Sequence, residues 1–374
     1  MTKLPVIIMI VLTCATSFAQ SVIVKGTGAG NVYRAGTGAG SVRGVVIAAP
    51  DPPITFDYYV STNGSHISPF DTWAKAATNI QDAVSIATNS ETVVISNGIY
   101  YLATQITVTK AITIQSKDNN PTNVIVDGQS TVRCFNMGST NAWLIGLTVQ
   151  NGNLENFDFY NGAGILSGSA SNCILNGNKT WASGGGASGA VLYNCTLTGN
   201  DAGGGGYGGG GANGGTLYNC TLTGNDAGMG GGAYGAVLYG CIFTGNSASA
   251  DGGGANGGTL YNCTLTGNDA LDSGGVRDSI LYNCISWDNG VNLDYNVTEY
   301  YSCGINFTNG IGSITNNPLF VGGGDYRLQV GSPCINTGTN QAWMLGVSDL
   351  DGNKRIWPVD GTVDMGAYEY NSEP

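Results

Sequence analysis

A glycine-rich unit repeats in tandem through the centre of the 374-residue chain. Each copy contains a glycine run, a short apolar segment, a cysteine, a second apolar segment and Gly-Asn, as in GGGANGGTLYNCTLTGNDA at 252–270. Intervals of 22, 25, 21, 22, 21 and 19 residues separate seven cysteines, namely Cys173, Cys195, Cys220, Cys241, Cys263, Cys284 and Cys303. A constant period of about 22 residues predicts a solenoid in which every unit forms one coil.

Each unit is expected to consist of strands and turns. Glycine runs such as 203–215 disfavour a helix, because glycine has a low helix propensity. With the cysteine as position 0, leucine occupies position −3 and an apolar residue occupies position +2. Strand side chains alternate between two faces, so positions −3 and 0 can both face inward only if the chain bends between them.

Two asparagine columns support this interpretation. Position −1 tolerates the left-handed conformation that such a bend needs, because it holds Asn172, Asn194, Asn219, Asn262 and Asn283, with Gly240 as the exception. Position +5 is asparagine in six consecutive units, whose side-chain amides can hydrogen-bond from coil to coil: Asn178, Asn200, Asn225, Asn246, Asn268 and Asn289. The sequence therefore predicts an all-β, right-handed parallel β-helix of about ten coils, the fold class of pectate lyases.

The segment before the array is expected to open the solenoid. Apolar residues recur at helical spacing between Asn79 and Thr88, which predicts a short N-terminal helix capping the first coil. The motifs Tyr59-Val60-Ser61, Ile80-Gln81 and Gly98-Ile99-Tyr100 resemble the N-terminal module of secreted parallel β-helix proteins. That resemblance implies the same architecture.

Two further resemblances concern the repeats and the C-terminal part. Gly231-Gly232-Ala233 and Phe243-Thr244-Gly245-Asn246 resemble the GGA[ILV] and FxxN elements of polymorphic outer-membrane protein adhesin repeats. DYRLQVGSPCINTG at 325–338, DLDGNKR at 349–355 and VDMGAYE at 363–369 resemble the choice-of-anchor Q domain of secreted bacterial β-helix proteins. In that family the domain usually precedes a surface-anchoring tail, which implies a location at the cell surface.

The chain is expected to be exported. Lys3 precedes an apolar run, and the small residues around Ala19 predict cleavage of a secretory signal peptide there. The predicted organisation is a signal peptide at 1–19, a glycine-rich leader at 20–56, a parallel β-helix at 57–316 with glycine-rich repeats at 162–290, and an anchor-Q-like module at 317–374. No stretch reaches the 18 apolar residues of a membrane span, so we expect a cell-surface or extracellular protein.

The charge of the chain limits the kinds of partner that it is expected to bind. A net charge of -12 with dispersed Lys and Arg argues against nucleic acid and anionic membranes as partners. We expect a monomer that binds a polysaccharide, or a glycan or protein of a cell surface.

Equivalent cysteines on coils about 4.8 Å apart have β-carbons too distant for a disulfide, so the periodic cysteines are expected to be buried thiols. Cys134 and Cys334 lie outside the period and stay unassigned.

Position −2 provides the candidate ligand-binding residues. One tyrosine per coil occupies it, and the bend at position −1 places the column outward: Tyr193, Tyr218, Tyr239, Tyr261 and Tyr282. Such a column can contact sugar rings or a partner protein, and stacked tyrosines can equally serve to support the fold. We therefore expect a non-catalytic protein that acts in adhesion or glycan binding.

The alternative function is a polysaccharide-degrading enzyme, either a lyase or a glycoside hydrolase. β-Elimination requires a base such as Lys or Arg, and residues 150–300 contain only Lys179 and Arg277. Glycoside hydrolysis requires two carboxyl groups, which Asp201 and Asp226 could supply from neighbouring coils. Asp in Gly-Asn-Asp-Ala is also typical of a turn, so no catalytic residue is assigned.

A third function is ice binding through Thr-x-Thr columns, represented by Thr196 with Thr198, Thr221 with Thr223, and Thr264 with Thr266. Thr is also a favoured strand residue.

The segment from Asp349 to Asn353 contains carboxylates that could bind calcium, but it lacks the further ligands of a complete loop, and we interpret it as a turn. No metal or cofactor is expected, with calcium as the weak exception.

Overall fold

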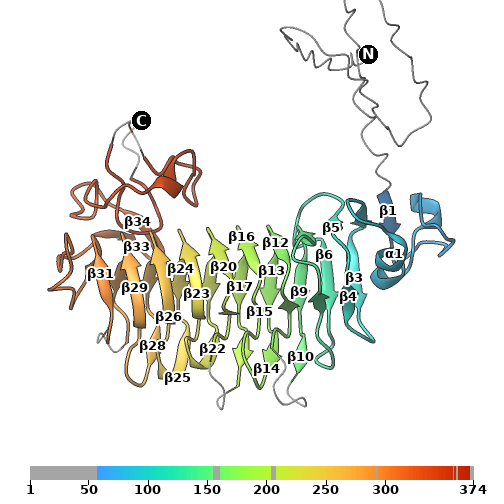
Figure 1. The fold of residues 1–374 in the computed structure, drawn as a ribbon, viewed down its shortest axis with the longest axis horizontal. Coiled ribbons are helices and arrows are strands. Elements are labelled where there is room, and N and C mark those ends of the chain that lie inside the picture. The colour runs from blue at the N-terminus through green and yellow to red at the C-terminus, as the bar shows by residue number, and fades with distance from the viewer. Residues whose placement is uncertain are drawn as a thin grey trace, which may run out of the picture. The chain divides into compact units, whose positions relative to one another are not determined.

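The computed structural model describes residues 57–154, 161–203, 208–290, 294–356, 358 and 361–370. The predicted signal peptide and glycine-rich leader lie outside these residues. The described chain winds into a solenoid of short strands that pair in parallel from coil to coil (Figure 1). This confirms the prediction of an all-β parallel β-helix.

Sheet A has sixteen strands arranged in two columns that merge toward the C-terminal end. One column contains β1 (Asp57–Val60), β2 (Thr92–Ile95), β5 (Thr113–Ser116), β8 (Trp143–Ile145), β12 (Ser169–Ser171), β16 (Val191–Tyr193) and β20 (Thr216–Tyr218). The other contains β4 (Ile106–Val108), β7 (Phe135–Met137), β11 (Ile165–Leu166), β15 (Ala187–Ser188) and β19 (Ala212–Asn213). Both columns continue into β23 (Ala233–Tyr239), followed by β26 (Ala255–Tyr261), β29 (Val276–Tyr282) and β31 (Thr298–Tyr300).

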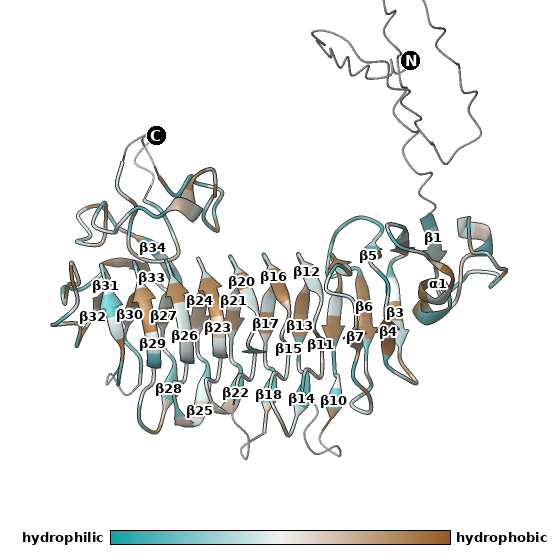
Figure 2. Cartoon of the chain, viewed as in Figure 1, coloured by the Kyte–Doolittle hydropathy of each residue, from teal (hydrophilic) through white to brown (hydrophobic). Residues whose placement is uncertain are grey.

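Sheet B and, from β10 to β28, sheet C complete the coils. Sheet B contains β3 (Gly98–Tyr101), β6 (Val124–Asp127), β9 (Thr148–Gln150), β13 (Ile174–Asn176), β17 (Thr196–Thr198), β21 (Thr221–Thr223), β24 (Ile242–Thr244), β27 (Thr264–Thr266), β30 (Ile285–Trp287) and β32 (Cys303–Gly304). Sheet C contains β10 (Asn153–Leu154), β14 (Lys179–Thr180), β18 (Asp201–Ala202), β22 (Asp226–Met229), β25 (Ser247–Asp251) and β28 (Asp269–Ala270). Figure 2 shows that the sheet C strands are more hydrophilic than those of sheets A and B.

The bend predicted at position −1 is present. In the coil of Cys195, Leu192 and Cys195 are buried, whereas Tyr193 is partly exposed. Asn194 lies between them with φ of 51°, and Gly240 occupies the equivalent position with φ of 63°. The left-handed residue resets the alternation of side chains, so both apolar positions reach the core.

The position +5 asparagines form the predicted buried ladder. Asn225 Oδ1 accepts hydrogen bonds from the backbone N–H of Asn200 at 3.0 Å and from its Nδ2 at 2.9 Å. Asn225 Nδ2 in turn donates to Leu197 O and to Asn246 Oδ1, both at 2.9 Å. All six asparagines of this column are buried. Their hydrogen bonds to one another and to the backbone therefore satisfy polar groups that water cannot reach.

The cysteine column is buried and reduced from Cys173 to Cys284, as predicted. The Sγ of each of three cysteines accepts a hydrogen bond from the preceding cysteine's N–H, as in Cys263 N to Cys284 Sγ at 3.4 Å. The prediction that Cys303 continues this column is wrong. Ser302 takes the place, because its Oγ accepts from Cys284 N at 3.0 Å, and Cys303 pairs with Ile285 in sheet B.

The glycine runs permit close approach between backbones. In the three-residue runs of the array, a β-carbon on the second glycine would overlap the carbonyl oxygen of the position +6 residue, as for Gly185 with Asp201 and Gly231 with Ser247. The first glycine of these three-residue runs has a positive φ, for example 61° at Gly230. The runs are therefore required both by backbone conformation and by packing.

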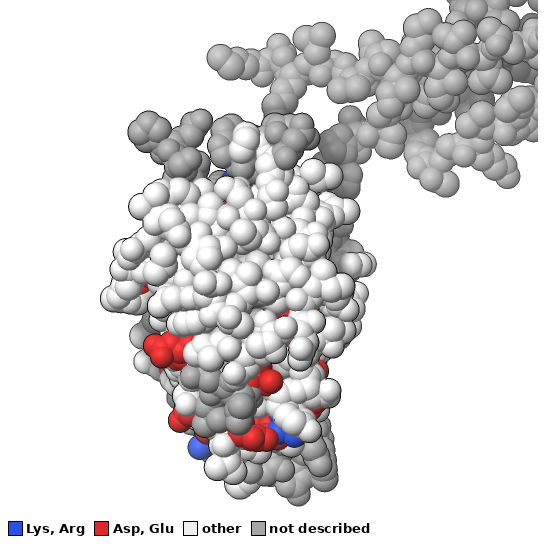
Figure 3. Space-filling model, turned by 90° about the vertical axis from the view of Figure 1, so that its left-hand side faces the viewer, with Lys and Arg blue, Asp and Glu red and all other residues white. Residues whose placement is uncertain are grey.

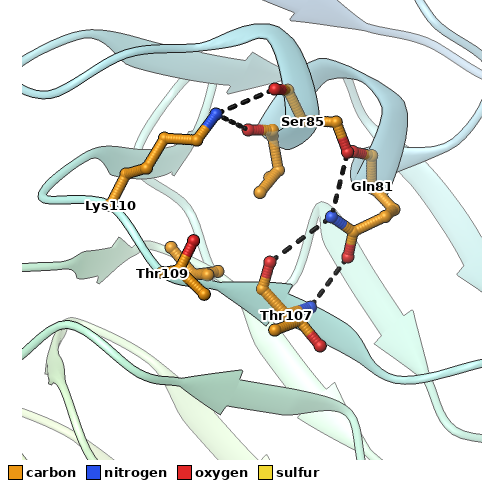
Figure 4. Close-up of a pocket in the computed structure, with 7 residues that line it drawn as sticks. Gln81, Ser85, Thr107, Thr109 and Lys110 are labelled. Atoms are coloured by element: carbon orange, nitrogen blue, oxygen red, sulfur yellow. Dashed lines mark hydrogen bonds between the residues drawn. The ribbon is translucent and has the colours of Figure 1, made fainter.

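The predicted capping helix is α1 (Ile80–Ile86), with Asn79 as its N-cap, and it follows the 3-10 turn η1 (Trp73–Lys75). Gln81 covers the free edge of β4, since its Oε1 accepts from Thr107 N at 2.7 Å and its Nε2 donates to Thr107 O at 3.3 Å. Lys110 Nζ donates to the carbonyls of Ser85 and Ala87 at the helix end. A small pocket of about 300 Å³ remains between α1 and β4 (Figure 4).

The C-terminal module contains the antiparallel pair β33 (Phe320–Gly322) and β34 (Asp325–Leu328) and the 3-10 turn η2 (Ala342–Met344). It docks along the corner between sheets A and B, where the position −1 asparagines project. Asn219, Asn262 and Asn283 each donate a side-chain hydrogen bond of 3.0 Å to its backbone, at Ser348, Asp364 and Thr339. Of the described helices, none is long and apolar enough to span a membrane.

Candidate functional site

The position −2 tyrosines form a continuous stack on the outside of sheet A. Register pairs each tyrosine with its equivalent on the next coil, so neighbouring rings lie 4.8 to 5.1 Å apart with interplanar angles of 5 to 7°. The predicted column of Tyr193, Tyr218, Tyr239, Tyr261 and Tyr282 is therefore brought together as one feature, which we call the tyrosine ladder. Its role in ligand binding stays a prediction.

The ladder extends further than the sequence period suggested. Tyr300 stacks on Tyr282 at 4.9 Å, and Trp143 stacks on Tyr193 at 5.7 Å. Both lie outside the regular repeats, where counting from Cys303 places Tyr300 at position −3. Counting from Ser302 would have assigned Tyr300 to the column, whereas no periodic signal identified Trp143.

Parallel stacking determines which part of each ring is presented. Because the rings of adjacent coils face one another, the inner tyrosines offer ring edges and hydroxyl groups to solvent rather than open ring faces. Burial raises the pKa of Tyr218, with a further contribution from its two neighbouring phenols. Its hydroxyl therefore stays protonated at neutral pH and can both donate and accept hydrogen bonds. A sugar would meet a row of hydroxyls, not the stacking platform that the sequence suggested.

The C-terminal module covers part of the ladder. Trp343, in η2, packs edge-on against Tyr239 with ring centroids 4.9 Å apart and lies 6.3 Å from Tyr261. The segment formed by Trp143, Tyr193 and Tyr218 precedes this contact and is partly exposed. We take it as the part of the ladder best placed to meet a ligand.

The Thr-x-Thr columns do not form one open grid. Thr196, Thr198, Thr221 and Thr223 are partly exposed on sheet B. Thr264 and Thr266 are buried, and Thr264 Oγ1 accepts from Ala367 N of the C-terminal module at 3.0 Å. The third alternative, ice binding through Thr-x-Thr columns, therefore lacks a continuous exposed threonine face, because the module docks over its C-terminal half.

The two candidate carboxylates occupy adjacent rungs of sheet C, where Asp201 pairs with Asp226. Lys179, one rung before, approaches Asp201 Oδ2 at 3.3 Å, and Ser247 Oγ donates to Asp226 Oδ1 at 2.6 Å. The column therefore places Lys179, Asp201, Asp226 and Ser247 on successive rungs of sheet C. Each carboxylate thus has a partner on a neighbouring rung.

A second cluster of acidic residues lies near the C-terminal end of the solenoid, on the sheet C side, and surrounds Arg277. Arg277 contacts Asp251, Asp272 and Asp278, and its guanidinium lies 5.1 Å from the ring centre of Tyr295. Figure 3 shows acidic groups gathered on the lower part of this end, while its upper part is almost uncharged. No group of three or more His, Cys, Asp or Glu able to hold a metal ion occurs among the described residues.

The Asp349 segment forms a turn. Asp349 Oδ1 accepts from the backbone N–H groups of Asp351 and Asn353 at 2.9 and 2.8 Å, and its Oδ2 accepts from Glu369 N at 2.8 Å. These bonds tie the turn to the end of the module. The arrangement agrees with our interpretation of the segment as a turn.

A buried cluster of charged residues lies within the module, beside the solenoid. The Arg355 side chain is fully buried, and its Nη1 donates to Gly366 O at 3.3 Å and lies 3.4 Å from Glu369 Oε1. The guanidinium occupies the space beside Gly240, where any side chain would overlap it. This explains why position −1 is glycine in that coil alone, and the break in the asparagine column was the sequence signal for Arg355.

Burial raises the pKa of Glu369 to about 8 and that of Asp364 to about 6. An acid with a raised folded-state pKa favours folding at low pH, and this contribution is lost as the pH rises from the unfolded value through the folded value. The folded module should therefore lose stability between about pH 4 and pH 8, by roughly 1.4 kcal/mol per pH unit for each group in its window. Hydrogen exchange of the module amides, corrected for intrinsic rates, should be faster at high pH.

The matched control for this pH effect is Glu369→Gln, which keeps the shape of the side chain and removes the ionisation. Above about pH 6, where Asp364 has already titrated, the variant should show little further loss of protection. If hydrogen exchange of the native module, after correction for intrinsic rates, were equally slow from about pH 4 to pH 8, the prediction would be contradicted.

Comparison with known proteins supports the fold and leaves the family open. No family model and no curated protein sequence matches this chain. The structure of pectate lyase Pel9A is similar, with a TM-score of 0.54 at 15% identity over 85% of this chain and 97% of that chain. A pectin methylesterase from Aspergillus niger gives a TM-score of 0.37 at 13% identity, covering 70% of this chain and 84% of that chain. The similarity to Pel9A shows a shared parallel β-helix fold.

Proposed function

We propose that this chain is a non-catalytic β-helix that binds carbohydrate at a cell surface or in the extracellular space. The observation that carries the proposal is the tyrosine ladder, whose phenol groups repeat at the spacing of the coils, 4.8 Å between Tyr193 and Tyr218. A regular row of groups that donate and accept hydrogen bonds complements a glycan, which presents many hydroxyls along its length. Pel9A, whose name describes a pectate lyase, uses the same fold.

Charge favours a neutral glycan over an acidic one. The net charge of -12 opposes the approach of a polyanion such as a polyuronate, because long-range repulsion lowers its concentration at the surface. The basic side chains within the array contact carboxylates of the chain itself, as Arg277 does with Asp251 and Asp272. The proposed ligand is therefore an uncharged polysaccharide or an uncharged surface glycan.

The test removes hydroxyls while keeping the ring stack. The double variant Tyr193→Phe/Tyr218→Phe should lose about fivefold to a hundredfold in affinity, because each neutral hydrogen bond contributes about 0.5 to 1.5 kcal/mol. Binding should be measured on an array of neutral glycans and by co-sedimentation with insoluble polysaccharides. Tyr101→Phe is the matched control, since Tyr101 is 64% exposed and lies outside the ladder.

The same assays separate binding from catalysis. Asp201→Asn/Asp226→Asn should leave glycan binding unchanged, and the native chain should release no reducing ends. Full binding by the double tyrosine variant would refute the role of the ladder. Reducing-end release that disappears in the aspartate variant would instead identify a glycoside hydrolase.

A further inference from the structure

Two cysteines that the repeat does not use meet at the boundary between the solenoid and the C-terminal module. Cys303 lies in β32, the last strand of sheet B, and Cys334 lies in the module. Both side chains are fully buried. They belong to a small core cluster separate from the main core, together with Ile285, Leu328 and Met365.

The contacts of each cysteine fix its position on one side of this boundary. Cys303 Sγ donates to Asn316 O at 3.1 Å, and Cys334 O accepts from Met365 N at 3.0 Å. Proximity to the Cys334 side chain, followed by burial, raises the pKa of the Cys303 thiol well above its usual value. In the structure both cysteines are free thiols, buried in the same small cluster and closed to water.

This pair differs geometrically from the cysteines of the column. Column cysteines lie on parallel strands in register, so their β-carbons are held about one rung apart, near 4.8 Å, with parallel Cα–Cβ vectors. A disulfide prefers β-carbons about 3.5 to 4.5 Å apart. Cys334 belongs to an irregular segment and approaches Cys303 from the module. Rung spacing therefore does not constrain its β-carbon.

We propose that Cys303 and Cys334 form a disulfide that ties the C-terminal module to the last coil of the solenoid. The reaction joins the two sulfur atoms and releases two protons and two electrons. A disulfide-bearing oxidant, such as a thiol–disulfide oxidoreductase or oxidised glutathione, accepts the electrons and is reduced to two thiols. Export from the cytoplasm, predicted from the N-terminal sequence, would place the chain where such oxidants act.

Burial sets the order of events. An oxidant cannot reach thiols that are fully buried in the docked state, so the mixed disulfide forms before the module has docked. Docking then brings the second thiol to the mixed disulfide and expels the reduced carrier. The cross-link joins residues 31 positions apart in the sequence, 303 and 334, and restricts the module when it is undocked.

Tryptic peptides of the full chain provide a direct test. Cleavage after Arg277, Arg327 and Lys354 places Cys303 in peptide 278–327 and Cys334 in peptide 328–354. After refolding in a mixture of reduced and oxidised glutathione, acid quenching, alkylation and digestion, the two peptides should be recovered as one linked species. Reduction should separate them.

Three variants assign the bond. Cys303→Ala and Cys334→Ala should abolish the linked species, whereas Cys284→Ala should retain it, although Cys284 lies in the same tryptic peptide. Complete alkylation of all cysteines in the refolded native chain would overturn the proposal, as would a link that depends on Cys284. Because the native chain alone can give the first of these results, the test does not depend on the folding of a variant.

A second measurement tests the consequence for the module. Hydrogen exchange through undocking of residues 325–370 should be at least about tenfold slower in the oxidised chain than in the chain treated with dithiothreitol. Equal rates in both forms would show that the bond does not restrain the module.

Discussion

Replacing Asn225 by Ala is expected to destabilise the solenoid by about 4 kcal/mol or more. The change removes the acceptor of the Asn200 backbone N–H and the donor to the Leu197 carbonyl, both of which lie within the buried ladder. Each buried polar group left without a partner costs about 1 to 3 kcal/mol, and the bond to Asn246 is also lost. The urea midpoint of the full chain, followed by circular dichroism, measures the effect.

Asn213→Ala is the matched control for this prediction. Asn213 lies in the same repeat but is partly exposed, and its side chain makes one long hydrogen bond of 3.4 Å to Ser188 Oγ. Its replacement should change stability by less than about 0.5 kcal/mol. A loss below about 1 kcal/mol for Asn225→Ala would show that water substitutes for the amide, which would contradict a dry ladder.

Gly231→Ala is expected to cost about 3 kcal/mol or more and to impair folding. The added methyl group would overlap the backbone carbonyls of Ser247 and Gly253, which cannot rotate away as a flexible side chain could. Gly231 has no positive φ, so steric overlap rather than conformational strain causes the loss. Expression yield, thermal unfolding and the urea midpoint measure the outcome.

Substitutions at two other glycines distinguish steric overlap from backbone strain. Gly224 has φ of 60°, and a β-carbon added to it would meet no atom within 4 Å, so Gly224→Ala should cost about 1 to 2 kcal/mol through strain alone. Gly138→Ala should be nearly neutral, because its nearest neighbour would lie at 3.6 Å. If Gly231→Ala cost no more than Gly224→Ala, close packing of the coils would not explain the glycine runs.

The parts of the molecule that could be predicted share one property: each depends on contacts between equivalent residues of adjacent coils. The Asn225 ladder, the left-handed Asn194 and the stack of Tyr193 on Tyr218 all follow from period and alternation. In a parallel β-helix every residue meets its own equivalent one period later. A residue type that recurs once per period in the sequence therefore forms a column along the solenoid.

The departures from prediction arise where that rule ends. Ser302 replaces cysteine in the column because the last coil is shorter, 18 residues separating it from Cys284. Trp343 covers part of the tyrosine ladder from a segment that has no counterpart in the array. Neither feature has a periodic signal, since each occurs once.

The sequence alone determined the fold of this protein, the direction in which each column faces and the identity of its buried polar ladder. The reason is that these properties depend on spacing between neighbouring coils, which is a local pattern in the chain. Tertiary structure alone decided which outward side chains stay open, because the module docks on coils about 100 residues earlier, as Ala367 does on Thr264. Such long-range contacts bury Thr264 and bring Cys334 to Cys303, and only the folded chain places them together.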